Sequence, residues 1–338
     1  MDSFTQIVLG AGMGEIALGK KVGNKALLWG AIAGTIPDLD VLASPFMTDL
    51  QAMAFHRGIS HSLIFSIGFA PILGFLITLC YKKKEANWLE WTWLGFLGLI
   101  THPLLDCFTT FGTQLFLPFS DYRVAFNSIF IVDPIYTIPF LICLVVAACL
   151  QKKSPARSVW AWIGVIFSTS YLFFTLGNKL YINYRFDRSL SAQKIEYSRM
   201  MSTPTPFNNV LWTGIAEGKD NFYVGNYSWF DSNPEISFTT VPHNHALIAA
   251  WDSTYAIKKL RWFSNGYYCI TKVNKELVYN DMRFGQTGIE SKKNQQYVYA
   301  YNLIKRPSGD LDAEKRNVEF SPSKKDFQQL WLRIKGNK

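Results

Sequence analysis

The stretch SLIFSIGFAPILGFLITLCY, residues 62–81, contains no charged residue in 20 positions. An α-helix of that length rises about 30 Å, which is the thickness of the hydrocarbon core of a bilayer. A buried helix of a soluble domain seldom needs so long an uncharged run. The stretch therefore predicts a membrane span, and it decides the fold class of the first half of the chain.

Three further stretches repeat the apolar pattern. Residues 132–150 and 159–176 are predicted spans, and residues 88–105 are a weaker one because a glutamate and a histidine lie near its ends. Hydropathy of this kind over several segments is typical of a multi-pass protein. We therefore expect an α-helical polytopic membrane domain over residues 1–176.

Within residues 7–36, two shorter apolar stretches, residues 7–19 and 26–36, are too short to cross a bilayer comfortably alone. Each contains two glycines four residues apart, namely Gly10 with Gly14 and Gly30 with Gly34. This spacing lets two helices approach closely, so the segment is predicted to be a packed helical hairpin partly sunk in the membrane. The acidic Asp2 ahead of it argues against a cleavable signal peptide.

The charges of the chain divide unevenly between its halves. The sequence is 49% hydrophobic and 17% charged with a formal net charge of +9, yet residues 1–176 hold 11 of its 34 Lys and Arg and 10 of its 25 Asp and Glu. The positive excess therefore lies in residues 177–338, without a run of like charges long enough for a nucleic-acid arm. No nucleic-acid partner is expected, and the lipid bilayer is the predicted partner of the first half.

Nine of the 11 bases in the first half lie in three short loops. They are Lys20, Lys21 and Lys25; Lys82, Lys83 and Lys84; and Lys152, Lys153 and Arg157. The positive-inside rule places such loops in the cytoplasm. Alternating spans then put the N-terminus and residues 177–338 outside. We therefore predict a multi-pass protein of the bacterial inner membrane, with an outward-facing C-terminal domain and all three histidines of the first half on the outer side.

The outward ends of the spans carry a candidate metal constellation. Its motifs are Pro37-Asp38-Leu39-Asp40, His56-Arg57-Gly58-Ile59-Ser60-His61 and Thr101-His102-Pro103-Leu104-Leu105-Asp106. Imidazoles with carboxylates suit a divalent metal, zinc first. Ionisable groups within membrane segments are costly and usually functional, which supports a shared site.

Each motif also has a simpler interpretation. Asp38 suits a helix cap or a turn, and Ser60 is expected to cap the following span. The loop at residues 56–61 can meet lipid headgroups, although Arg57 also offers a planar fork for a phosphate or carboxylate. His102 and a carboxylate four residues later can form a structural pair.

Two more acids of the membrane half have open roles. Asp133 precedes a proline at a predicted helix start, where a cap is the usual role. Glu15 lies among glycines and can either pair inside the hairpin or reach the site. In the site itself a metal would lower the pKa of a bound water towards about 7, and a spare carboxylate would act as general base.

These motifs, together with Met1-Asp2-Ser3-Phe4-Thr5 and Gly10-Ala11, resemble the membrane-bound metal-dependent hydrolases of the YdjM type. The same group is described as LexA-binding, inner-membrane-associated hydrolases, although nothing in this chain encodes that association. The resemblance covers about residues 1–140 well, and the rest is similar to longer members with an added C-terminal domain. It implies hydrolase activity, a divalent metal and an integral membrane location.

The resemblance also implies which residues form the site. The implied ligands are Asp38, Asp40, His56, His61, His102 and Asp106. Asp38 and Asp106 are also candidates for general base, and Arg57 is the candidate anion clamp. One departure is Gln6, where many members have histidine, so that either the shell is completed elsewhere or the first residues only shape the pocket.

The second half has a different pattern. Residues 177–203 are polar with helical periodicity and predict a stalk that continues the last span. Residues 204–338 show strand-like alternation, as in residues 221–227 and 296–301, and predict a small β-rich soluble domain. His243-Asn244-His245 would place two imidazoles on one strand face, but without a nearby acid a surface turn is the preferred interpretation.

The expected function is metal-dependent hydrolysis of an ester or phosphoester at the outer membrane surface. The location suggests an amphiphilic substrate, such as a phospholipid or a lipid-linked phosphate. The alternative is a non-catalytic scaffold or receptor with a structural His/Asp cluster and a partner-binding β domain. A transporter is disfavoured because the acids gather at one face instead of lying along the spans.

Overall fold

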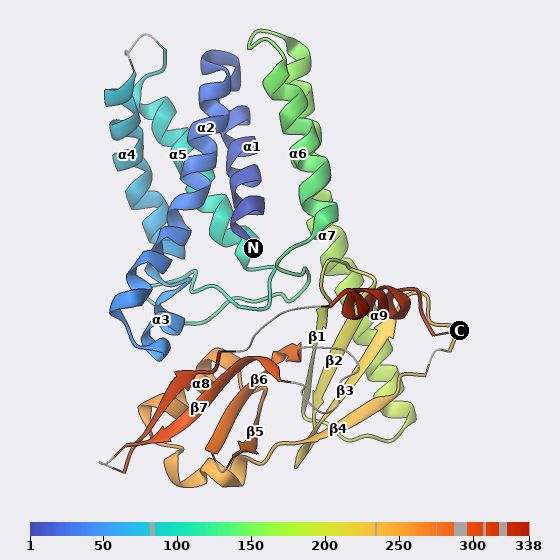
Figure 1. Cartoon of the computed structure of the whole chain (residues 1–338). Helices are drawn as coiled ribbons and strands as arrows, with labels where there is room; N and C mark the ends of the chain where they lie inside the picture. The colour runs from blue at the N-terminus through green and yellow to red at the C-terminus, as the bar shows by residue number, and fades with distance from the viewer. Residues whose placement is uncertain are drawn as a thin grey trace. The chain divides into compact units, whose positions relative to one another are not determined.

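A computed structural model shows helices in the first part of the chain and two antiparallel sheets in the second (Figure 1). It describes residues 1–81, 85–233, 235–274, 276–286, 296–306, 309–317 and 323–337. The order of helices before strands confirms the predicted fold class at this level. Contacts divide the chain into two units, of which the first comprises Met1–Leu42, Phe55–Asn178 and Pro206–Asn208.

The first unit is built from helices, and Figure 1 shows α1, α2, α4, α5 and α6 side by side. The helical elements up to the first strand are α1 (Ser3–Val22), α2 (Asn24–Thr35), η1 (Ile36–Phe46), α3 (Asp49–Phe55), η2 (Ile59–His61), α4 (Leu63–Cys80), α5 (Trp88–Asp106), α6 (Pro134–Cys149) and α7 (Pro155–Ala192). Buried apolar side chains fill the bundle, with Trp91 and Phe140 among the largest.

The hairpin of α1 and α2 follows from its capping and glycine residues. The Asp2 carboxylate accepts a hydrogen bond from the Thr5 backbone N–H at 3.0 Å and caps α1. Gly23 ends α1 at a φ of 65°, in the left-handed region that glycine tolerates best. Along the contact, a Cβ atom on Gly30 would lie 2.3 Å from the Gly10 carbonyl oxygen. The backbones therefore approach too closely for any side chain there.

Three helical segments within the described residues are long and apolar enough to cross a membrane: Asn24–Phe46, Leu63–Cys80 and Pro155–Ala192. The last two contain most of the predicted spans at 62–81 and 159–176. The first corrects the expectation of a short segment ending near residue 36. The α-helix stops at Thr35, but η1 continues the helical path because Pro37 stands in its first turn, where proline is tolerated.

The other two predicted spans are helical but fall outside that group. α5 matches the predicted stretch 88–105 closely, and α6 is apolar but only 16 residues long. Of the basic loops, Lys82, Lys83 and Lys84 lie outside the described residues. The cytoplasmic placement of the basic loops and the outward orientation stay predictions.

The second unit comprises Ala43–Ala54, Lys179–Thr205 and Asn209–Lys338, and it contains both sheets. Its elements are β1 (Arg199–Pro204), β2 (Leu211–Glu217), β3 (Asn221–Ser228), β4 (Phe238–Pro242), η3 (His245–Trp251), α8 (Tyr255–Ser264), β5 (Tyr268–Val273), β6 (Glu276–Gln286), β7 (Tyr297–Lys305), β8 (Leu311–Lys315) and α9 (Lys324–Ile334). Each sheet is a meander, in the orders β1-β2-β3-β4 and β5-β6-β7-β8.

The predicted helical stalk at residues 177–203 needs a correction. α7 continues only to Ala192, and β1 already begins at Arg199. Its last turns are held by burial instead of standing free, because Ile182 and Phe186 pack into a cluster with Trp212 of β2. Pairing with β2 then draws the chain after Ala192 into the sheet, which helical periodicity alone could not show.

The two histidines of the second half do not share a strand face. β4 ends at Pro242, and Asn244 turns the chain at a φ of 54° before η3 starts at His245. The turn agrees with the preferred interpretation, but His243 is buried and its ring lies 4.2 Å from that of Phe222.

Candidate metal centre

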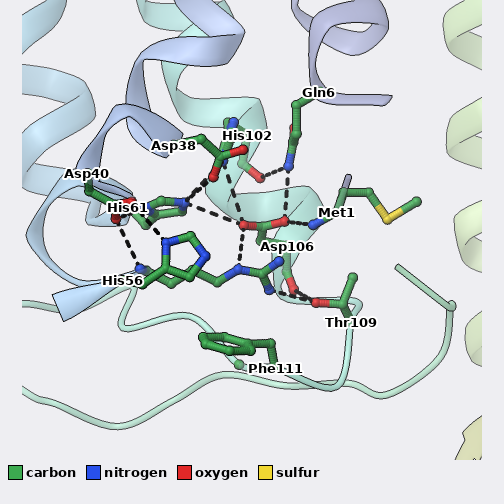
Figure 2. Close-up of polar contacts among 12 residues, drawn as sticks. Met1, Gln6, Asp38, Asp40, His56, His61, His102, Asp106, Thr109 and Phe111 are labelled. Atoms are coloured by element: carbon green, nitrogen blue, oxygen red, sulfur yellow. Dashed lines mark hydrogen bonds and ion pairs between the residues drawn. The ribbon is translucent and has the colours of Figure 1, made fainter. Parts of the chain in front are cut away.

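Three helix ends bring the predicted site residues together at one end of the bundle. Asp38 lies in the first turn of η1, His61 ends η2, and His102 and Asp106 lie in the last turns of α5. Figure 2 shows these four side chains turned toward one another. Their spacing in the sequence is wide, so only the packing of α2 and α5 and the loop before α4 unites them.

The four side chains present four ligand atoms to one point. His61 Nε2 and His102 Nε2 are 3.1 Å apart, and Asp38 Oδ1 lies 3.3 Å from the first and 3.4 Å from the second. Asp106 Oδ2 lies 3.6 Å from each Nε2. All four atoms lie within 4.8 Å of one another, and only the Asp38 side chain is more than 1% exposed.

The tautomers of both imidazoles follow from their outer nitrogens. His102 Nδ1 lies 2.6 Å from the Gly34 carbonyl oxygen, which can only accept, so Nδ1 carries the proton. Ser60 Oγ donates to Asp40 Oδ2 and therefore accepts from His61 Nδ1, both at 2.9 Å. Burial lowers the pKa of His61 to about 4, which keeps its ring neutral near pH 7. Both Nε2 atoms thus present lone pairs to the centre.

The arrangement fits a divalent cation. Two imidazole lone pairs and two carboxylate oxygens converge, and none of these four atoms carries a proton in that state. Bonds of about 2.0–2.2 Å in a tetrahedral site imply ligand separations of roughly 3.4 Å, and the five separations above lie between 3.1 and 3.6 Å. Both outer nitrogens are also anchored, as is usual for metal-binding histidines.

Asp106 is held in place by three residues from two parts of the chain. Its Oδ1 accepts from Gln6 Nε2 at 3.0 Å and from the Met1 amino group. Its Oδ2 accepts no hydrogen bond within the described residues, although Arg57 Nε lies 3.1 Å away. Arg57 Nη1 in turn donates to Thr109 Oγ1 at 2.8 Å. An oxygen that is buried, charged and without a hydrogen bond is consistent with a ligand position.

Arg57 and Gln6 are therefore placed around Asp106. Arg57 is 3% exposed, and its guanidinium lies 4.9 Å from the Phe111 ring. This burial supports a positioning role at the carboxylate, while the predicted anion clamp stays a prediction. Gln6 also donates to the His102 carbonyl oxygen at 3.2 Å. Gln6, which stands where many members have histidine, thus contacts both His102 and Asp106 and orients the Asp106 carboxylate.

Asp40 and His56 lie beside the four-residue cluster and not in it. His56 Nδ1 is 2.9 Å from Asp40 Oδ1, and Asp40 Oδ2 accepts from the Arg57 backbone N–H at 3.1 Å. The same Oδ2 lies 3.5 Å from His61 Nδ1. Asp40 therefore orients the loop that carries His61, and His56 packs against it with its side chain 28% exposed.

The structure separates two other candidates from the centre. Asp133 caps α6, accepting from the Ile135 backbone N–H at 2.9 Å, and it also accepts from the Tyr171 hydroxyl at 2.9 Å. Glu15 neither pairs inside the hairpin nor reaches the site. Instead its two oxygens accept from the Arg157 guanidinium, each at 2.6 Å.

The expected cap at Ser60 is also corrected. Ser62 caps α4 by accepting from the Phe65 backbone N–H at 3.1 Å, which leaves Ser60 free to bridge His61 and Asp40. Ser60 and Ser62 are separated only by His61, so the sequence did not decide which serine caps α4. The anchoring oxygens of Ser60 and Gly34 were not identifiable from residue type.

Comparison with known proteins assigns the helical part of the chain to a family. Residues 1–181, more than half of the chain, match the family described as YdjM inner membrane protein. The chain belongs to the YdjM inner membrane protein family. All residues of the candidate centre lie inside the matched range, which confirms the family resemblance drawn from the sequence motifs.

One curated relative carries no described activity in its name. The chain is 29% identical over 153 residues to "Uncharacterized protein YfhP" of Bacillus subtilis (strain 168), which covers 43% of this chain and 46% of YfhP. The chain therefore spans about half the length of that relative. No solved structure matches.

Proposed function

We propose that this member of the YdjM family is a membrane-bound hydrolase that uses a divalent metal to cleave an ester or phosphoester at the outer membrane face. The observation that carries the proposal is the convergence of His61 Nε2, His102 Nε2 and two carboxylate oxygens, with both outer ring nitrogens anchored. Zinc is the first candidate because imidazole and carboxylate ligands suit it.

The chain's own residues divide the work of such a site. A bound divalent metal would supply Lewis acidity and lower the pKa of a coordinated water. His61, His102 and Asp106 would hold it, with Asp106 positioned by Arg57 and Gln6. Asp38 has the one partly exposed side chain of the four, at 17%, so it is best placed to meet substrate and to take a proton as general base.

Metal content of the full chain, purified in detergent, tests the proposal. We expect about one equivalent of a divalent metal in the wild type, as for a single site that binds one ion. The double variant His61→Ala/His102→Ala should lose it. His245→Ala is the matched control, because its imidazole bonds to the Tyr268 carbonyl oxygen in the other unit.

Hydrolysis is then assayed separately. The metal-loaded protein is expected to release nitrophenol from a nitrophenyl phosphodiester or ester, and a chelator should stop the release until metal is restored. A wild type that binds no divalent metal, or a double variant that keeps its metal, overturns the proposal in favour of a structural cluster. A protein that binds metal but hydrolyses neither probe class contradicts the hydrolase part alone.

A further inference from the structure

An apolar groove runs along the seam between α1 and α2. This open groove has a volume of about 270 Å³ and is lined by Ile7, Ala31, Ile32, Thr35, Ile36 and Leu39. The one hydroxyl in this lining, on Thr35, donates to the Ala31 carbonyl oxygen at 2.9 Å and so needs no other partner. The groove therefore offers a wall without unmet polar groups.

The groove lining and the candidate centre are adjacent along η1. Leu39 and Ile36 flank Asp38 in η1, and Ser3 stands one helical turn before Ile7 on the same face of α1. The Ser3 hydroxyl lies 3.5 Å from Asp38 Oδ2, while Asp38 Oδ1 faces the two imidazoles. Asp38 thus stands between two lining residues of the groove along η1, and its two carboxylate oxygens face Ser3 and the imidazoles.

The remaining ligands are closed to other approaches. The side chains of His61, His102 and Asp106 are at most 1% exposed, so the accessible edge of the cluster is Asp38. A molecule that reaches the centre along this edge meets Ser3, Asp38 and the apolar lining together. That combination of a polar end and an apolar wall matches an amphiphile.

We propose that the α1–α2 groove holds the hydrocarbon chain of an amphiphilic substrate whose ester or phosphoester lies at Asp38; this inference rests on the proposed hydrolase function. From Ala31 to Asp38 the helical path rises roughly 10 Å, at about 1.5 Å per residue. This length accommodates part of a fatty chain beside its head group. The hydrocarbon chain enters the groove from the bilayer, because α2 and η1 form the candidate span Asn24–Phe46.

The groove contributes placement more than affinity. A chain that leaves the bilayer for an apolar groove exchanges one apolar environment for another, so burial adds little free energy. Its lining instead fixes where the scissile bond stands relative to Asp38, which is the kind of positioning that raises the rate of a reaction. Filling the groove should therefore remove a specific contact and leave general lipid binding intact.

Photocrosslinking in lipid nanodiscs tests the groove directly. The probe is a hexadecyl nitrophenyl phosphodiester with a diazirine in the middle of its chain, added to the metal-loaded full-length protein. Mass spectrometry should find several-fold more crosslinks in the peptide with residues 24–46 than in that with residues 63–80. Ile32→Trp, or the milder Ala31→Leu, should abolish this excess.

The control variant is Ile72→Trp, which places the same side chain on the exposed face of α4, where Ile72 is 52% exposed. It should leave the crosslinking pattern unchanged, and all variants should keep the wild-type metal content. Equal labelling of both peptides, or an excess that survives Ile32→Trp and Ala31→Leu, overturns the groove. If the excess is present but the probe is never hydrolysed, the hydrolase proposal fails and the groove stands.

Discussion

The Nε2 atoms of His61 and His102 lie 3.1 Å apart, and with both Nδ1 atoms protonated neither neutral ring has a proton to give the other. Each ring donates its Nδ1 proton outward, to Ser60 Oγ and to the Gly34 carbonyl oxygen. Two facing lone pairs repel each other, so a cation between them would stabilise the neutral arrangement. The strength of metal binding should therefore depend on the outward hydrogen bonds.

Ser60→Ala tests the hydrogen bond to His61. Removing the hydroxyl takes away the acceptor for Nδ1 and the bridge to Asp40, so the ring loses its fixed orientation. Loss of such an outer partner typically lowers metal affinity by about 10–100-fold. Titration against a competing chelator measures this change. Ser191→Ala, an exposed position on α7, should leave the affinity unchanged.

Arg57→Ala should weaken the centre through Asp106. The guanidinium beside Asp106 Oδ2 offsets the charge of a carboxylate that is buried at one end of the bundle. Without it the carboxylate binds a proton more readily, and the proton competes with the metal for the carboxylate oxygen. We expect lower metal affinity and a higher pH at which metal binding is half-maximal. Chelator titration across a pH series measures both.

Arg57→Lys distinguishes positioning from anion binding. A lysine keeps the charge but cannot contact both Asp106 and Thr109 with one planar group. If Arg57 positions Asp106, metal affinity should fall in this variant. Binding of inorganic phosphate should then decrease only in proportion to the metal that is lost. Unchanged metal affinity with lost phosphate binding would instead support the anion clamp predicted from the sequence.

The local signals of the first half were sufficient to predict its helices. Uncharged runs predicted α4 and most of the apolar part of α7, and the paired glycines predicted the close packing of α1 against α2. The continuation of η1 to Phe46 was not predicted, because two prolines and two aspartates interrupt the apolar sequence there. The end of α7 was missed for another reason: pairing of β1 with β2 outweighs the helical preference of residues 193–203.

The site could be predicted only as far as residue types allow. Four of the six candidate ligands converge. They could be predicted because histidine and aspartate are uncommon at the ends of membrane spans. The separate roles of Asp40 and His56 depend on a loop turned by Arg57 at a φ of 59°, which no pattern encodes. The partner of Glu15 was missed because Arg157 follows it by 142 residues.

Gly30→Ala should destabilise the hairpin. A Cβ atom there would lie 2.3 Å from the Gly10 carbonyl oxygen, and backbone cannot move aside as a flexible side chain can. Overpacking of this kind costs about 1–3 kcal/mol. Gly68→Ala in α4 is the matched control, because no described atom lies within 4 Å of the added Cβ. Thermal unfolding in detergent should show a lower midpoint for the first variant and an equal or higher one for the second.

The ion pair between Glu15 and Arg157 offers a test of packing away from the centre. Both side chains are at most 3% exposed, and the guanidinium donates to both carboxylate oxygens at 2.6 Å. Arg157→Met leaves a buried carboxylate without its partner, which costs about 3–5 kcal/mol. The double variant Glu15→Leu/Arg157→Met removes both charges and should recover most of that loss. Unfolding free energies of the single and double variants complete the cycle, and additive losses would show that the two groups do not interact. Metal content should stay at the wild-type level throughout, since neither residue touches the four ligands within the described structure.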